Sequence, residues 1–335
     1  MEKAASNEPL NVVAIGGGTG LATLLTGLKE FVRRDPKLGW SIRDLAAIVA
    51  VSDDGGSSGR LREEFGMPPP GDIRNCMVAL SEDSKLLSKL FRHRFSGRGE
   101  LGGHNFGNLF LAALSELTGD FAEAVTLSSE ILASKGHIYP ATDSDVKIAA
   151  ELEDGTVVRG ETNIGKIGIK ITRLFLEPDD CRPLDVASAA VAEADVITVG
   201  PGSMYTSLLP PLLVRGFGEQ IKSSPAKKVF ICNLMTQPGE TDGLTARQHL
   251  DVIRRHVPGL AFDRIVVNSK PISPEQARKY GGEGAEQIGV HGSMDSDKIY
   301  ESDVFRAELL ADGEMVRHDP MRLAEAVFRS IDRPI

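Results

Sequence analysis

The chain has 335 residues, of which 41% are hydrophobic and 25% charged, an ordinary globular mixture that can bury a large core. Its net charge of -9 at neutral pH provides no overall basic field for nucleic acid. Three isolated cysteines without CxxC spacing argue against a disulfide framework or a zinc site. With no signal-peptide pattern in the polar N-terminal segment and no apolar run long enough for a membrane span, we expect a cytoplasmic protein with neither nucleic-acid nor membrane partners.

Strand and helix signals alternate in the first part of the chain. An apolar run at 11–15 leads through a glycine cluster into a helical pattern over 21–34. The continuous apolar run 44–51 is typical of a buried parallel strand. These elements predict a βαβ unit with a right-handed crossover, and helical patterns follow at 71–95 and 105–134.

A stretch from about 144 to 177 departs from this alternation. Two strand-like runs flank Asp154 and Gly155, a strong hairpin signal. The run 167–176 then predicts another strand. We interpret this stretch as a small β-rich insertion.

The alternation then resumes and continues to the C-terminus. Strands are predicted at 194–200, 227–233 and 264–268, and helices at 242–257 and 319–331. The sequence therefore predicts one domain over residues 1–335, with a Rossmann-like α/β fold. We expect a mostly parallel sheet with helices on both faces and the small β-rich insertion.

The first glycine loop provides the first candidate ligand-binding residues, which are Gly17, Gly18, Thr19 and Gly20. The loop ends a strand and opens a helix, whose free N–H groups and positive dipole end suit a phosphate. Thr19 is the expected cap of that helix. The loop is not a dinucleotide fingerprint, because Leu21 occupies the third glycine position, and it lacks a P-loop ending. A bare tight turn is the alternative for this loop alone.

The second strand ends in an acidic pair and a second glycine-rich loop. The candidate ligand-binding residues here are Asp53, Asp54, Gly55, Ser57, Ser58 and Arg60. The two acids suit ribose hydroxyls or a metal ion such as Mg²⁺, while the serines and glycine amides suit an anion. The alternative is a solvated turn whose acids pair with nearby arginines.

Further along, Asp72 is expected to cap a helix that carries Arg74 and Asn75 as candidates. Later polar loops add further candidate residues: His104, Asn105, Asn108, Gly200, Gly202, Ser203 and Thr236. Several of these loops follow predicted strands, and ligands of open α/β sheets bind beyond the carboxyl ends of strands. The alternative for each of these loops, taken alone, is that it only connects two elements and binds no ligand.

Long ordered motifs make the sequence recognisable. The segments GGGTGLATLLTGLK, SDDGGSSGRLREEFGMPPPGDIRN, GHNFGNLFLAAL and VGPGSMYTSLLPPLLV resemble the bacterial gluconeogenesis factor family, as do NLMTQPGETDG, PISPEQARKY and VRHDP. The likeness covers roughly residues 11 to 330. That family is related to the phospholactate transferase of deazaflavin cofactor synthesis. The resemblance implies the same fold.

The resemblance also implies a function. It implies a regulatory protein that binds UDP-N-acetylglucosamine, or an NAD-like nucleotide, and is linked to cell shape and carbon metabolism. It places Tyr280 and Arg317 at ligand-contacting positions of the family. Tyr280 would stack on a pyrimidine or donate its hydroxyl, and Arg317 would pair with pyrophosphate. Gly281 and Gly282, which follow Tyr280, predict a mobile loop there.

An enzyme related to the phospholactate transferase is the alternative function. Such an enzyme would move a phosphorus-containing group with the help of a metal ion. No general base or covalent nucleophile with its partner is evident, so we favour a binding protein over an enzyme and name no catalytic residue. A nicotinamide dehydrogenase is a weaker third possibility. We also expect a homo-oligomer, namely a dimer.

Overall fold

The computed structural model describes residues 8–82, 85–165, 168–289 and 297–331. Most of the polar N-terminal segment, and Ile167 of the predicted strand 167–176, lie outside these ranges. No helix in the described ranges is long and apolar enough to cross a membrane.

An eight-stranded sheet with the order β10-β11-β9-β8-β7-β1-β2-β3 forms the centre of the fold. Its strands are β1 (Leu10–Gly16), β2 (Ile42–Val49), β3 (His137–Pro140), β7 (Val196–Val199), β8 (Lys227–Ile231), β9 (Arg264–Asn268), β10 (Lys298–Ile299) and β11 (Ser302–Ala307). Every neighbouring pair is parallel except the β10–β11 hairpin. The mostly parallel sheet predicted from the sequence is confirmed.

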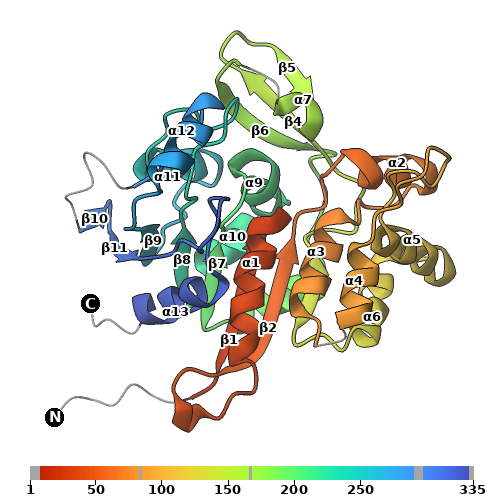
Figure 1. Cartoon of the computed structure of the whole chain (residues 1–335), viewed down its shortest axis with the longest axis horizontal. Coiled ribbons are helices and arrows are strands. Elements are labelled where there is room, and N and C mark those ends of the chain that lie inside the picture. Colours follow the sequence, from red (N-terminus) through yellow and green to blue (C-terminus); the bar gives the residue numbers. More distant parts are fainter. Residues whose placement is uncertain (1–7, 83–84, 166–167, 290–296, 332–335) are drawn as a thin grey trace.

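Helices cover both faces of this sheet (Figure 1). On one face, α1 (Gly18–Leu28) packs against both α3 (Gly71–Leu80) and α13 (Pro320–Ile331). On the other face, α8 (Asp185–Glu193), α9 (Leu209–Leu213) and α10 (Phe217–Ser223) pack together. The remaining long helices are α2 (Gly56–Phe65), α4 (Lys85–Arg92), α5 (Phe106–Thr118), α6 (Phe121–Ile131), α11 (Ala246–His256) and α12 (Pro274–Gly282).

The sheet has a topological switch point between β1 and β7. From β1 the chain moves to β2 on one side, whereas β7 leads to β8 and β9 on the other. At such a point the loops beyond the strand ends diverge toward opposite faces and leave a crevice between them. The loops that follow β1 and β7 are the first glycine loop and the glycine-containing loop 200–203, and both hold candidate residues predicted from the sequence.

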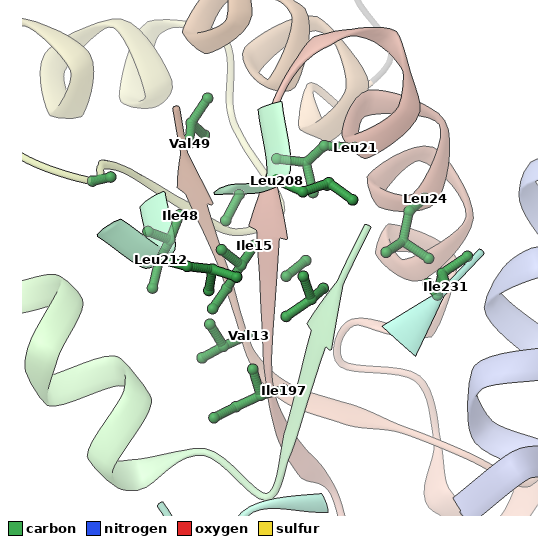
Figure 2. Close-up of a cluster of buried hydrophobic side chains, with 14 of the residues drawn as sticks. Val13, Ile15, Leu21, Leu24, Ile48, Val49, Ile197, Leu208, Leu212 and Ile231 are labelled. Carbon is green, nitrogen blue, oxygen red and sulfur yellow. The ribbon is translucent and has the colours of Figure 1, made fainter. Parts of the chain in front are cut away.

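A continuous apolar core holds the central strands to their helices (Figure 2). Val13 and Ile15 of β1 lie at its centre, with Leu21 and Leu24 of α1 on one side and Leu212 of α9 on the other. All five side chains are at most 2% exposed. This packing fixes the helix that begins at the first glycine loop.

The predicted β-rich insertion is a three-stranded antiparallel sheet with the order β5-β4-β6. Its elements are β4 (Lys147–Leu152), β5 (Val157–Arg159), the short helix α7 (Glu161–Ile164) and β6 (Ile171–Glu177). It stands at the top of the view in Figure 1, between the ends of α2 and α12. Buried Arg62 of α2 holds its root, because Nη2 donates to the Val146 carbonyl at 2.6 Å and pairs with Asp145 at 2.5 Å.

Two local expectations are wrong. Gly281 and Gly282 form the last turn of α12 rather than a loop after Tyr280, and this helix begins with a capping box between Ser273 and Gln276. The helical pattern 21–34 gives an α-helix only to Leu28, followed by a 3₁₀ turn over Lys29–Phe31.

Leu24→Ala should lower the free energy of unfolding by about 2–5 kcal/mol, because it leaves a cavity under β1. Leu24 is 0% exposed, whereas Leu117 on α5 is 82% exposed and offers a matched control. Urea unfolding followed by circular dichroism measures both changes. A cost for Leu24→Ala no larger than for Leu117→Ala would contradict this view of the core.

Candidate functional site

A cavity of about 460 Å³ lies at the switch point, within the usual range of roughly 300–1,000 Å³ for small-molecule sites. Its walls come from the loops after β1, β7 and β8, from the segment 316–318, and from Glu161 of the insertion. Of the residues predicted from the sequence, the lining includes Gly17, Gly18, Thr19, Gly20, Gly202, Ser203 and Arg317. Segments far apart in the sequence therefore meet at one site.

The two glycine loops touch each other backbone to backbone. A Cβ on Gly20 would lie 2.4 Å from the Pro201 carbonyl oxygen, so no other residue fits without moving one loop. Gly18 has φ +63°, a left-handed conformation that favours glycine. The glycines of the first loop are thus needed for the approach of the second loop as well as for the turn itself.

The start of α1 is arranged to receive a negative group. Its N-cap is Gly17, without a side-chain cap, so the predicted capping role of Thr19 is wrong. The carboxyl of Asp72 accepts a hydrogen bond from the Gly18 N–H, so Asp72 serves α1 rather than its own helix as predicted. The N–H groups of Thr19 and Gly20 have no acceptor within the helix and remain available to a ligand.

The loop after β7 is already in contact with a carboxylate. The Ser203 hydroxyl donates to Glu240 Oε2 at 2.5 Å, and the backbone N–H of Tyr205 also bonds to the Glu240 carboxylate. Asn233 fixes the loop, since its side chain accepts from the Gly202 N–H at 3.0 Å and donates to the Gly202 carbonyl at 2.7 Å. The helical turn Met204–Leu208, which follows this loop, therefore differs at its start from α1.

Carboxyl groups crowd the floor between the cavity and α2. Burial raises the pKa of Glu161 to about 8, and the negative charges of Asp53, Asp72 and Asp54 add to the effect, while a hydrogen bond from Thr206 opposes it. Burial likewise raises the pKa of Asp72 to about 6, with the Gly18 N–H opposing. Both carboxyls therefore hold protons more readily than exposed acids do.

Asp53 and Asp54, the predicted ribose or metal ligands, are outside the cavity lining and have partners within the chain. Asp53 Oδ1 accepts from the Gly55 N–H at 2.8 Å. Asp54 Oδ1 accepts from the N–H and hydroxyl of Thr162 at 2.9 and 2.7 Å, which joins this loop to the insertion. In the described ranges, no group of three or more His, Cys, Asp or Glu side chains is arranged to hold a metal ion. The metal role stays a prediction.

Ser57, His104, Asn105 and Asn108 form a buried network between α2 and α5. The Ser57 hydroxyl lies 3.1 Å from His104 Nδ1 and 3.3 Å from both the Asn105 N–H and Asn108 Nδ2. Asn105 also caps α5 by accepting from the Gly107 N–H. Burial and the charge of Arg60 lower the pKa of His104, which favours a neutral ring. These side chains are satisfied within the chain rather than by the cavity.

The arginines of the same region also have hydrogen-bond partners within the chain. Arg74 donates to Asn108 Oδ1 at 2.9 Å and to Asn75 Oδ1 at 2.7 Å, and Arg60 donates to the Gly102 carbonyl at 2.9 Å. Ser58 is buried on α2. The predicted residues from Ser57 to Asn108 thus lie outside the cavity lining.

Three further predicted residues also lie outside the lining. Gly200 has φ +89°, and a Cβ there would lie 2.7 Å from the Ile231 carbonyl oxygen, so it serves strand packing. Thr236 is buried, and its hydroxyl accepts from the Glu286 N–H at 2.8 Å. The Tyr280 hydroxyl accepts from the Val316 N–H at 3.1 Å, and so it supports the segment that carries Arg317.

The lining also includes residues that were not among the candidates, and Glu161, Asn233, Gln237 and Glu240 are four of them. The last three belong to the polar loop after β8, so the strand-end rule already pointed to their segment but not to these members. Glu161 belongs to the insertion, and no local signal places it near the glycine loops. Only the folded position of the insertion brings it there.

Glu161→Gln should stabilise the ligand-free protein at pH 8 by about 1–3 kcal/mol and change its stability little below pH 4.5. Because the folded state raises the pKa of Glu161, it binds more protons than the unfolded state between these pH values, and wild-type stability falls as pH rises. Urea unfolding across this range tests it, with exposed Glu116→Gln as control. An unchanged pH slope in Glu161→Gln would disprove the buried-carboxyl account.

Comparison with known proteins places the chain in a family. The model of the 2-phospho-L-lactate transferase CofD family matches residues 12–310. The gluconeogenesis factor of Halalkalibacterium halodurans is 46% identical, with 96% of this chain and 97% of the relative covered, and that of Bacillus subtilis is 45% identical over 93% and 95%. The crystal structure of a UPF0052 family protein from Bacillus halodurans aligns with a TM-score of 0.89 at 45% identity, covering 96% of this chain and 99% of that one. The resemblance seen in the motifs is confirmed, and the chain belongs to the 2-phospho-L-lactate transferase CofD family, with close relatives named gluconeogenesis factors.

Proposed function

We propose that the chain is a cytoplasmic regulatory protein that binds a nucleotide sugar in the cavity at the switch point. UDP-N-acetylglucosamine is the first candidate ligand. An NAD-like nucleotide, which has similar chemistry, is the second candidate for the same cavity. The observation that carries the proposal is the pairing of free N–H groups at the start of α1 with Arg317 across one cavity. Through this ligand the protein would link precursor supply to cell shape and carbon metabolism.

The charges of the cavity support a ligand with a phosphate at one end. Arg317 is the only Arg or Lys among the described residues that line it. An arginine fork and helix N–H groups together suit a diphosphate. The remaining wall mixes polar and apolar residues and, in the described part of the chain, carries no charged side chain apart from Glu161 and Glu240, which suits a sugar better than a second anion.

A transferase related to the phospholactate enzyme is the second candidate. The family match supports it, and so does the acidic floor formed by Asp53, Asp72 and Glu161, since phosphoryl-group transfer commonly uses carboxylates with Mg²⁺. If such an ion binds, Asp53 and Asp72 would hold it, since the Asp72 carboxyl already lies at the start of α1, and the ion would neutralise phosphate charge. The binding proposal requires no such step.

Thermal unfolding with a ligand panel separates the two candidates. UDP-N-acetylglucosamine should raise the unfolding temperature more than UDP or N-acetylglucosamine alone, because it binds the native state through both of its ends. The panel includes NAD, GDP and Mg²⁺ with each nucleotide. Stabilisation by GDP without any by uridine nucleotides would favour the transferase and contradict the proposed ligand.

Arg317→Ala should weaken UDP-N-acetylglucosamine about 10- to 100-fold, as expected for the loss of charge-assisted hydrogen bonds to phosphate. Titration calorimetry measures the affinity, and circular dichroism checks the fold. Arg43→Ala serves as the matched control, because Arg43 is exposed near the amino end of β2, at the opposite edge of the sheet. If a folded Arg317→Ala protein bound the ligand with wild-type affinity, Arg317 would not contact the ligand.

Tyr280→Phe should weaken the same ligand by a smaller factor, about 2- to 10-fold, which corresponds to one neutral hydrogen bond. The tyrosine hydroxyl holds the Val316 N–H and thereby the segment of Arg317, so its removal loosens the segment without removing a ligand contact. A double variant with Arg317→Ala should show little further loss, because both changes act through Arg317. Additive losses would instead indicate that Tyr280 contacts the ligand itself.

A further inference from the structure

Two glycine loops border the cavity, but only one of them is free to take a phosphate. At the first glycine loop, Asp72 takes only the Gly18 N–H, and the N–H groups of Thr19 and Gly20 have no acceptor within α1. At the loop after β7, Glu240 already accepts from the Ser203 hydroxyl and from the Tyr205 N–H. A carboxylate in this position repels a second anion and presents acceptors instead of donors to the cavity.

Glu240 is held firmly in this position. The turn Gln237–Thr241 is closed by hydrogen bonds from the N–H groups of Glu240 and Thr241 to the Gln237 carbonyl, at 3.0 and 2.9 Å. The Gln237 N–H in turn donates to the Thr241 hydroxyl at 2.9 Å. Burial raises the pKa of Glu240, and the bonds from Ser203 and Tyr205 oppose this rise. Glu240 is therefore a fixed part of the wall rather than a surface side chain that swings through solvent.

The same wall holds other acceptors that lack donors. Gln237 Oε1 and His318 Nε2 are buried, and neither has a hydrogen-bond partner among the described residues. Burial lowers the pKa of His318 to about 4, opposed by a bond from its ring to the Cys232 carbonyl, so the ring is neutral and Nε2 is an acceptor at neutral pH. Unpaired buried acceptors are costly, and a ligand that brings donors relieves that cost.

We propose that Glu240 is a specificity-determining residue that accepts hydrogen bonds from sugar hydroxyls of the ligand and so fixes the direction in which the ligand lies. The phosphates lie against α1 and Arg317, and the hydroxyl-bearing sugar lies against the loop after β8. A carboxylate has about four acceptor positions, of which the described contacts use those facing Ser203 and Tyr205. The inference rests on the proposed function, since it assigns a role within the same cavity.

Two sources of hydroxyl groups fit this wall, namely the ribose and the N-acetylhexosamine. Titration calorimetry with UDP-N-acetylglucosamine and with UDP separates them, using wild type, Glu240→Ala and Glu240→Gln. Glu240→Ala should weaken UDP-N-acetylglucosamine about 10- to 100-fold, the range for hydrogen bonds to a charged group. An equal loss for UDP identifies the ribose, whereas unchanged UDP binding identifies the hexosamine.

Glu240→Gln keeps the volume and one acceptor oxygen, so it should lose less affinity than Glu240→Ala and it guards against a folding defect. Glu116→Ala, on the exposed side of α5, is the matched control and should bind like wild type. Circular dichroism and thermal unfolding without ligand confirm that each variant is folded. Wild-type or tighter binding of both ligands by folded Glu240→Ala and Glu240→Gln overturns the inference, and tighter binding would mean that the carboxylate only repels phosphate.

The wild-type titration tests the proposed function separately. If wild type binds neither uridine ligand, the proposed ligand class fails and the role of Glu240 fails with it. If wild type binds and both Glu240 variants bind equally well, only the role of Glu240 fails.

Discussion

The backbone contact between the two glycine loops is the constraint on which the site depends. Gly20 lies so close to the Pro201 carbonyl that a single methyl group would separate the loops. That contact brings the starts of two helices, which leave the sheet on opposite faces, to one point beyond β1 and β7. The crevice of the switch point becomes a cavity because a third loop, the C-terminal segment and the insertion close its remaining sides.

The two helix starts are alike in sequence but different in charge. Asp72 takes one N–H of α1 and leaves others free, whereas Glu240 sits on the start of the helix after β7. Positive partial charge at a helix start attracts any nearby anion, including one supplied by the chain itself. The cavity is therefore polarised, with an end that attracts anions at α1 and Arg317 and an end that accepts hydrogen bonds at Glu240.

The insertion is part of the site and not an appendage. It is held at its root by Arg62 and at α7 by Asp54, and both of these residues belong to the segment that follows β2. This attachment places the Glu161 carboxyl next to Asp53 and Asp72, in a position that burial and like charge make unfavourable for an ionised acid. A buried carboxyl group that lowers the stability of the folded protein in this way is typical of sites that bind a ligand, a proton or a cation.

The sequence by itself determined the fold class, the first βαβ unit, the insertion and the glycine-rich loops at the strand ends. These features depend on local patterns, namely apolar periodicity and glycine at strand ends, which neighbouring residues are enough to reveal. The resemblance carried by the motifs also identified the family. Arg317 was found only through that resemblance, because nothing local distinguishes it from other surface arginines.

Only the tertiary structure decided which polar residues face the cavity and which face each other. Asp53, Asp54, Ser57 and His104 have the chemistry of ligand contacts, yet each has a partner supplied by a segment near or far in the chain. Glu161 carries no local signal, and the strand-end rule points only to the segment of Glu240, but folding brings both side chains to the same cavity. Whether a side chain is satisfied inside the protein depends on contacts between distant segments, and a pattern of neighbouring residues cannot specify those contacts.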